Sequence, residues 1–197
     1  MNLREKLFPK TREFYRIHHE DEHANEKFLN YLETLIPEKK QPIVIVSIGS
    51  DRSTGDALGP LVGSKLKDKL PELFVYGTLE SPVHAVNLKE NLHTIKQTFN
   101  DPFIIGIDAC LGQLSSIGVI TIADGPVSPG AAVNKQLPPV GDIHITGIVN
   151  VGGFMEYFVL QNTRLHLVMS MANFIADGLF SFLAERRNLN SQQSQSV

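Results

Sequence analysis

The sequence predicts an α/β protein of three layers, in which helices cover both faces of a mostly parallel central sheet. Two apolar, β-branched runs, 43–48 and 103–107, have the pattern of strands that are buried on both faces. Segments with helical periodicity separate these runs along the chain. Strands that alternate with helices in this way form parallel sheets, because each crossover places a helix on one face.

Each predicted element has its own local pattern. Apolar residues recur every three or four positions over 58–70 and 87–99, and Asn87 can cap the second helix while Glu90 reaches back to it. The strand at 118–123 follows a loop that is too short for a helical crossover, so we expect it to run antiparallel. The predicted strands are 43–48, 74–79, 103–107, 118–123 and 165–169, and the predicted helices are 58–70, 87–99, 153–162 and 172–186.

Charged residues are concentrated in the first 40 residues of the chain. Residues 1–40 hold 16 of the 39 charged residues, and a helical pattern within them ends at Pro37. We therefore expect a charged, helical N-terminal segment over 1–40 that packs on an α/β domain over 41–187. The last residues, 188–197, are polar and nearly featureless, which predicts a disordered tail.

Composition excludes several classes of function. The chain has 197 residues, with 18 Lys and Arg against 21 Asp and Glu, so it has no basic excess for binding nucleic acid. Its continuous apolar runs are far shorter than the ~20 residues of a membrane helix, and its N-terminus lacks the apolar segment of a signal peptide. One cysteine, Cys110, forms neither an intramolecular disulfide nor a thiolate zinc site. We expect a soluble, cytoplasmic protein. The composition allows either a monomer or an oligomer.

Two aspartates follow predicted strands of this sheet. Asp56 lies in the loop 49–60 between the first strand and its helix, and Asp108 comes directly after the strand at 103–107. In such sheets the working groups sit at the carboxyl ends of the strands. Two carboxylates at one site push their pKa values apart, which leaves one as a base and the other as a proton donor. Such a pair can activate water against a peptide bond, or bind a divalent metal together with a histidine.

Other interpretations of these residues stay open. The glycines of the loop 49–60 do not follow the dinucleotide-binding spacing, no P-loop lysine is present, and its two aspartates would repel a phosphate. Asp56 or Thr54 can instead cap the following helix, and Asp108 can cap its own loop.

Histidines and the cysteine provide further candidates. His144 shares a strand face with Asp142 and Thr146, although a lone histidine is more often structural. His84, at the end of the second strand, is a candidate substrate contact. We interpret Cys110 as an inert buried thiol rather than a nucleophile, because no histidine accompanies it in a recognisable pattern.

Three segments resemble, in the same order, motifs of the spore germination protease. Residues 53–60 resemble its Thr-Pro-Asp-Ala-Leu-Gly-Pro motif, 105–109 its second aspartate motif, and 128–135 its Pro-Gly-Ser-Gly-Val-Gly-Asn-Lys loop. The chain is also similar to a family of small sporulation proteins of spore-forming bacilli. Its residues 49–59 resemble the glycine- and aspartate-containing loop of the hydrogenase-maturation endopeptidases.

The resemblance implies a phosphorylase/hydrolase-like α/β/α fold and an endopeptidase of sporulation or germination. It implies that Asp56 and Asp108 are the catalytic residues, and we assign substrate binding to His84, Asn134 and Lys135. The hydrogenase-maturation enzymes hold a metal on an acidic residue, an aspartate and a histidine. This implies a divalent metal site on Asp56, Asp108 and, from a His-x-x-Gly pattern, His144.

The resemblance also implies the kind of substrate and its place in the cell. A protein or peptide is expected, with small acid-soluble spore proteins as one class, in the cytoplasm of the cell, the forespore or the spore core.

Departures from these families leave two other functions open. Gly55 replaces the proline or aspartate that precedes the key acid, and the chain is about half as long as the germination protease. The alternatives are a non-catalytic protein that binds a peptide or protein, and a metal-dependent hydrolase of small molecules. Retention of both carboxylates favours chemistry.

Overall fold

The structure, a computed structural model, describes residues 14–38, 41–130 and 137–194. Its strands are β1 (Phe14–His18), β2 (Ile43–Ser47), β3 (Phe74–Tyr76), β4 (Phe103–Gly112), β5 (Val119–Asp124) and β6 (Ile143–Val151). Its α-helices are α1 (Ala24–Leu35), α2 (Leu58–Lys69), α3 (Leu88–Thr98), α4 (Glu156–Gln161) and α5 (Leu165–Ser194), and two short 3₁₀ helices are η2 (Gly55–Ala57) and η3 (Leu114–Ser116).

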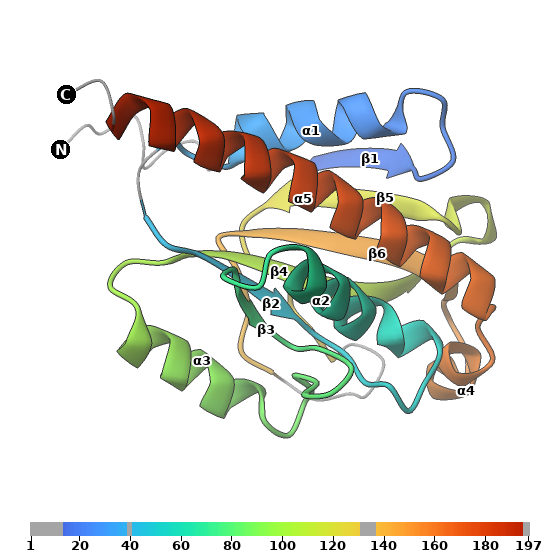
Figure 1. Ribbon diagram of the computed structural model, residues 1–197. Helices are drawn as coiled ribbons and strands as arrows, with labels where there is room; N and C mark the ends of the chain where they lie inside the picture. Colours follow the sequence, from blue (N-terminus) through green and yellow to red (C-terminus); the bar gives the residue numbers. More distant parts are fainter. Residues whose placement is uncertain (1–13, 39–40, 131–136, 195–197) are drawn as a thin grey trace, which may run out of the picture.

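In the described part of the chain, the strands form one six-stranded sheet with the order β1-β5-β6-β4-β2-β3 (Figure 1). The strands β6, β4, β2 and β3 are parallel to their neighbours. Strand β5 pairs antiparallel with β6, and β1 pairs antiparallel with β5. The predicted mostly parallel sheet and the antiparallel direction of the strand near 118–123 are both confirmed.

Helices cover the two faces unequally. Helices α1, α2 and α5 pack on one face, where isoleucines of β1, β2, β4, β5 and β6 form the main core (Figure 1). Helix α3 packs on the other face, where Leu88 and Ile95 contact Val44 and Val46 of β2. The prediction of three α/β/α layers is therefore confirmed.

Both ends of the chain differ from the prediction. Part of the expected helical segment 1–40 is the edge strand β1, in which Ile17 is buried while Phe14 and Arg16 are exposed. This alternation allows a charged segment to pair along the sheet. At the other end, α5 continues to Ser194, where a disordered tail was expected from residue 188.

Two further predicted elements are wrong or too long. The expected strand 165–169 is the first part of α5, since Val168, Ala172 and Ile175 are buried at helical spacing. The expected strand 74–79 ends at Tyr76, because Gly77 follows with φ of 95°.

One long apolar helix completes the main core. Over Leu165–Arg187, α5 is long and apolar enough to cross a membrane by length and composition alone. Half of its most apolar window is buried inside the fold. In the fold, α5 contacts α2, α1, β6 and η2.

Candidate active site

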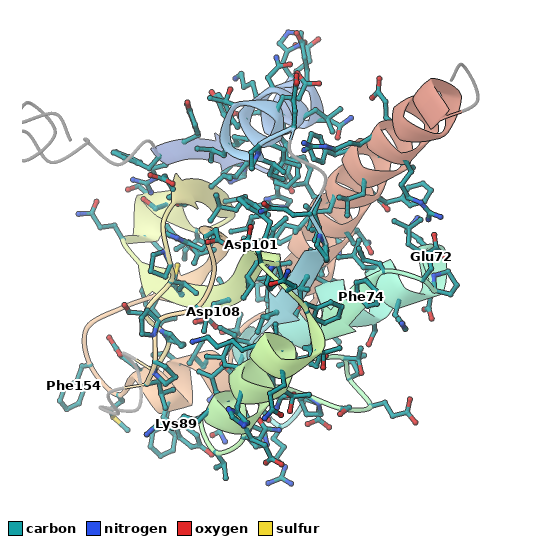
Figure 2. The ribbon with its side chains drawn as sticks, turned by 90° about the vertical axis from the view of Figure 1, so that its left-hand side faces the viewer. Glu72, Phe74, Lys89, Asp101, Asp108 and Phe154 are labelled. Atoms are coloured by element: carbon teal, nitrogen blue, oxygen red, sulfur yellow. The ribbon has the colours of Figure 1, made fainter. Side chains whose placement is uncertain are left out.

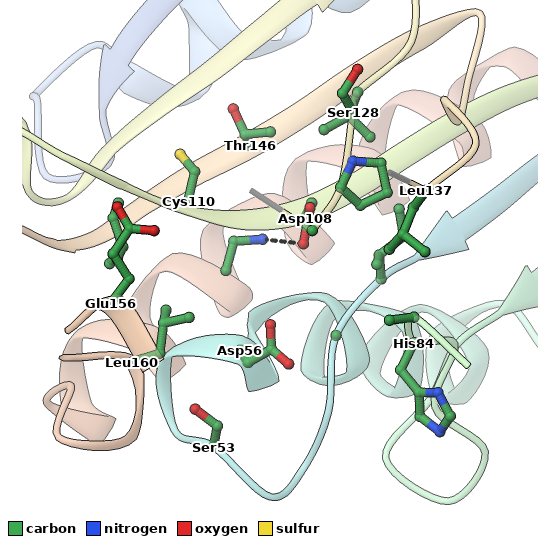
Figure 3. Close-up of a pocket in the computed structure, with 18 of the residues that line it drawn as sticks. Ser53, Asp56, His84, Asp108, Cys110, Ser128, Leu137, Thr146, Glu156 and Leu160 are labelled. Carbon is green, nitrogen blue, oxygen red and sulfur yellow. Dashed lines mark hydrogen bonds between the residues drawn. The ribbon is translucent and has the colours of Figure 1, made fainter. Parts of the chain in front are cut away.

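A pocket of about 310 Å³ opens at the carboxyl ends of β2 and β4, and both predicted aspartates line it (Figure 3). Its walls are the loop from Ile48 to Asp56, the ends of β4 and β6, helix α4 and the segment 127–130. The register explains the meeting of the aspartates. Strand β2 ends at Ser47, which pairs with Ile107 of β4. Asp108 is therefore the first residue of β4 that extends beyond the end of β2. Asp108 therefore lies inside β4, which continues to Gly112, and not at the strand tip as expected.

A tight turn returns Asp56 to the end of β2. Gly49 has φ of 144°, and a Cβ atom there would lie 2.0 Å from the backbone oxygen of Asp56. The backbone N–H of Ser50 donates to that same oxygen at 3.1 Å. Glycine is therefore required at position 49, because no side chain fits between the strand end and the returning loop.

Helix α4 packs directly on the turn that carries Asp56. A Cβ atom at Gly55 would lie 2.8 Å from Cδ2 of Leu160 and 2.9 Å from Oγ1 of Thr163. Gly55, which departs from the motif of the resembled proteases, therefore leaves the space in which α4 packs as a wall of this pocket.

Burial dominates the electrostatics of Asp56. The pKa of Asp56 is raised, because burial disfavours the charged carboxylate. The charge of His84 and the backbone N–H of Ser50 both oppose this rise.

Asp108 is held still more strongly in its neutral form. It is 8% exposed, and its pKa is raised well above the ordinary value by burial and by repulsion from Asp56. The backbone N–H of Ala109 donates to Oδ1 at 2.9 Å and opposes the rise. The two carboxyl groups titrate as a coupled pair in which Asp108 keeps a proton more strongly than Asp56.

His84 lies on the same pocket, across from Glu156 in Figure 3. Asn87 fixes its position, since Oδ1 of Asn87 accepts the backbone N–H of His84 at 2.8 Å and Nδ2 donates to the oxygen of Pro82 at 3.0 Å. The predicted side-chain cap of α3 by Asn87 is therefore wrong, because this side chain holds the His84 loop instead.

His144 is not brought to the two aspartates. It lies two residues before Thr146, the residue of β6 that pairs with Asp108, and its Nδ1 hydrogen-bonds with the oxygen of Gly125 at 2.8 Å. Over residues 14–38, 41–130 and 137–194, no group of three His, Cys, Asp or Glu side chains is arranged to hold a metal ion. The expected ligand set Asp56, Asp108 and His144 is not assembled. Asn134 and Lys135 lie outside the described residues.

Several pocket residues were not singled out from the sequence. The hydroxyl of Ser53 is buried and has no hydrogen-bond partner among the residues that the structure describes. Thr146 lines the pocket from β6, and Glu156 and Tyr157 line it from α4. The rule that led to Asp108 could have found this wall, because residues 152–157 follow the carboxyl end of β6.

Cys110 also lines the pocket, half-buried beside Asp108. Burial raises the pKa of its thiol to about 11, although a hydrogen bond with Thr146 opposes the rise. The thiol is therefore protonated at neutral pH, which agrees with its interpretation as an inert group.

The fold and sequence match known proteins. Residues 16–178 match the family described as "Protein of unknown function (DUF1256)", and the chain belongs to this family. The uncharacterized protein YyaC of Bacillus subtilis (strain 168) is 63% identical over 140 residues, which are 71% of this chain and 68% of that protein. The NiFe hydrogenase maturation protease HycI from Thermococcus kodakarensis KOD1 matches with a TM-score of 0.56 and 23% identity, over 78% of this chain and 99% of that chain.

These matches bear on the resemblance drawn from the motifs. The likeness to the hydrogenase-maturation endopeptidases is confirmed for the fold, and the identity of 23% extends it no further.

Proposed function

We propose that this member of the DUF1256 family is a peptidase that hydrolyses a protein substrate with Asp56 as general base and Asp108 as general acid. One observation carries the proposal. Two carboxyl groups line a single pocket, and burial together with their mutual repulsion gives them unequal proton affinities. Such a pair supplies both proton transfers that hydrolysis of a peptide bond requires.

The proposed reaction balances within the pocket. Asp56 accepts a proton from a water molecule, whose oxygen forms a bond to the carbonyl carbon of the substrate. The bond between that carbon and the amide nitrogen breaks, and Asp108 donates its proton to the leaving amine. The buried, unpartnered hydroxyl of Ser53 is the group we assign to the carbonyl oxygen, where it would donate a hydrogen bond as negative charge develops.

The biological setting follows from the resemblance to the spore germination protease. We propose small acid-soluble spore proteins as the first substrate class to examine, in the cytoplasm of the cell, the forespore or the spore core. The likeness in fold to a maturation protease is compatible with a protein substrate.

The decisive experiment compares two matched substitutions. Asp56→Asn keeps the shape of the side chain but removes the base, so we expect cleavage to fall by about 10³-fold or more. Asp68→Asn removes an exposed carboxylate of α2, away from the pocket, and should cleave like the wild type. Purified small acid-soluble spore proteins and unfolded casein are offered to each protein, and products are identified by mass spectrometry. Undiminished cleavage by Asp56→Asn would contradict the assignment, and no cleavage by the wild type would contradict the peptidase.

A chelator tests the metal-dependent version of this function. Cleavage that is lost in EDTA and restored by zinc or nickel would mean that a metal joins the two aspartates with ligands other than His144.

A second candidate is a protein that binds polypeptides without cleaving them. Exposed aromatic side chains beside the pocket favour this alternative, with Phe154 85% and Tyr157 56% exposed. Equal binding of a spore protein by the wild type and Asp56→Asn, without cleavage by either, would select it.

A further inference from the structure

Large apolar side chains are exposed along the edge of the sheet that carries the pocket. Four of them are near neighbours in the sequence, directly before and at the start of α4, and we call them the apolar lip: Phe154, Met155, Tyr157 and Phe158, exposed by 85%, 53%, 56% and 54%. Figure 2 shows Phe154 projecting outward from the molecule, whereas Asp108 lies inside it. Soluble proteins leave single apolar residues exposed, but a contiguous group marks an interaction surface.

Hydrogen bonds and packing hold the segment of the apolar lip against the rest of the fold. Asn150 of β6 donates through Nδ2 to the backbone oxygen of Val159 at 3.3 Å and to Oγ1 of Thr163 at 3.2 Å. Leu160 is buried against Gly55 on the inner side of the same helix. Tyr157 and Phe158 lie on this helix, and Phe154 and Met155 directly precede it, so the lip adjoins an element that is tied to both the sheet and the turn of Asp56. Such anchoring lowers the entropy lost on binding.

The apolar lip is continuous with the candidate active site. Glu156, Tyr157 and Leu160 of α4 form one wall of the pocket. Across the pocket, His84 and Ala85 lead to Val86, which is 83% exposed. A ligand at the aspartates that extends past α4 meets the apolar lip, and one that extends past His84 meets the exposed side chain of Val86.

The charges of the pocket restrict the chemistry of that ligand. Asp56, Asp108 and Glu156 line it, and no Lys or Arg lines it within the described ranges. Among the described residues, an anionic metabolite would meet only carboxyl groups and His84 as charged partners. Of the lip residues, a small neutral molecule that fills the pocket would contact Tyr157, which lines it, whereas an extended polypeptide can also reach Phe154, Met155 and Phe158 outside the pocket lining.

We propose that the apolar lip binds an extended polypeptide segment that carries large apolar side chains next to the bond held at Asp56 and Asp108. This inference rests on the proposed function, since it names the class of polypeptide that the same site takes. Each apolar side chain of the segment would be buried against the aromatic rings of the lip, and its backbone would cross the pocket.

The test measures binding separately from cleavage. Two fluorescein-labelled peptides have equal length and net charge, one with Phe and Leu at alternate positions and the other with Ser and Asn there. Fluorescence anisotropy with the full-length Asp56→Asn protein should give at least about tenfold tighter binding of the apolar peptide. Phe154→Ser, added to that protein, should weaken its binding by about tenfold.

Phe14→Ser is the matched control, because Phe14 is 65% exposed on β1, at the far edge of the sheet order from β2 and β3. It should leave peptide binding unchanged. Tyr157→Ser provides a second lip variant, and circular dichroism checks that each variant is folded. Equal binding by the lip variants and the control, or equal affinity for the two peptides, overturns the proposal.

Two outcomes separate this inference from the proposed function. Tight binding of the apolar peptide without cleavage by the wild type keeps the inference and rejects the peptidase. Cleavage of both peptides at equal rates keeps the peptidase and rejects the inference. A dimer that light scattering finds in the wild type, and that Phe154→Ser converts to a monomer with unchanged peptide binding, assigns the lip to a second copy and overturns the proposal.

Discussion

Two pockets lie at opposite ends of the parallel strands, and they differ in how their polar groups are paired. The larger, of about 460 Å³, is at the amino ends of β2 and β3, and the smaller is the candidate active site of about 310 Å³. At the larger pocket, Arg187 forms an ion pair with Glu72, and Arg186 donates to the backbone oxygens of Ile36 and Pro37. Figure 2 shows Glu72 and Phe74 on the other side of the molecule from Phe154.

In the smaller pocket, by contrast, polar groups repel one another or lack a hydrogen-bond partner in the described structure. Asp56 and Asp108 repel each other in a buried site, and the hydroxyl of Ser53 has no partner there in the part of the chain that the structure describes. Burying polar groups in this way costs stability, which a fold tolerates where the groups have a function. The unsatisfied polar groups, and not the pocket volume, are therefore the reason for choosing the smaller pocket as the candidate site.

The largest expected effect comes from removing the close approach that builds the smaller pocket. Gly49→Ala places a methyl group 2.0 Å from the backbone oxygen of Asp56, so the loop must move. We expect a loss of about 3 kcal/mol or more in the free energy of unfolding, together with loss of cleavage. Urea unfolding measures it. Gly153→Ala is the control, because Gly153 also has positive φ but no atom within 4 Å of the added methyl group, so its loss should be about 1 kcal/mol.

The next effect concerns the unpartnered hydroxyl groups. Ser53→Ala should lower kcat/KM by about 10²-fold, if its hydroxyl donates to the carbonyl oxygen, while stability is unchanged or slightly higher. Ser47 is matched to it, since its hydroxyl is also buried without a partner in the described structure but does not line the pocket. Ser47→Ala should not change the kinetics, and equal losses in the two variants would remove Ser53 from the reaction.

Stability should depend on pH through Asp108. Below the unfolded-state pKa of about 3.9 the group is protonated in both states and contributes nothing. As pH rises above that value, the unfolded chain loses the proton while the folded protein, with its raised pKa, keeps it, so stability falls towards the folded-state pKa. Asp108→Asn removes this cost, about 1.4 kcal/mol for each unit of the raised pKa.

Chemical unfolding of the wild type and Asp108→Asn at about pH 3.5 and at neutral pH checks this prediction. The variant should gain stability relative to the wild type only at the higher pH. A gain of the same size at both values would mean that charge on Asp108 is not its cause.

The smallest effect is expected at the larger pocket. Arg187→Ala breaks an ion pair whose side chains are 58% and 51% exposed, so we expect a loss of less than about 1 kcal/mol and no change in cleavage. Thermal unfolding and the cleavage assay together measure this. A large loss of cleavage would show that the two ends of the sheet are coupled, and would remove the contrast between the pockets.

The sequence predicted the layers and most of the sheet, because strands buried on both faces carry long apolar runs that are hard to mistake. The wrong secondary-structure predictions came from patterns that were considered over only a few residues. Residues 165–169 alternate like a strand, and only the helical spacing that continues to Ile175 and Leu179 identifies them as α5. β1 was missed because the charges of residues 1–40 concealed an alternating edge strand.

The candidate site was predictable as far as it depends on strand ends. Asp56 and His84 lie in loops that follow β2 and β3, Asp108 lies in β4 beyond the end of β2, and all three line the pocket. Glu156 could have been found by the same rule, because it follows the carboxyl end of β6, whereas the contact of α4 with Gly55 joins distant segments and has no local pattern. Ser53 was missed because the burial of its hydroxyl without a partner appears only in the folded pocket. His144 was placed on the correct strand face, but two residues from the level of Asp108.

The neutral carboxyl group of Asp108 also gives the protein an internal spectroscopic label. A protonated carboxyl group and a carboxylate absorb infrared light at different frequencies, and burial together with repulsion from Asp56 raises the pKa of Asp108 and keeps its proton in place. A cationic group entering the pocket would favour release of that proton, whereas an apolar one would displace water and favour its retention. Difference spectra of wild type and Asp108→Asn would therefore report what occupies the pocket, and with which charge, before any substrate is identified.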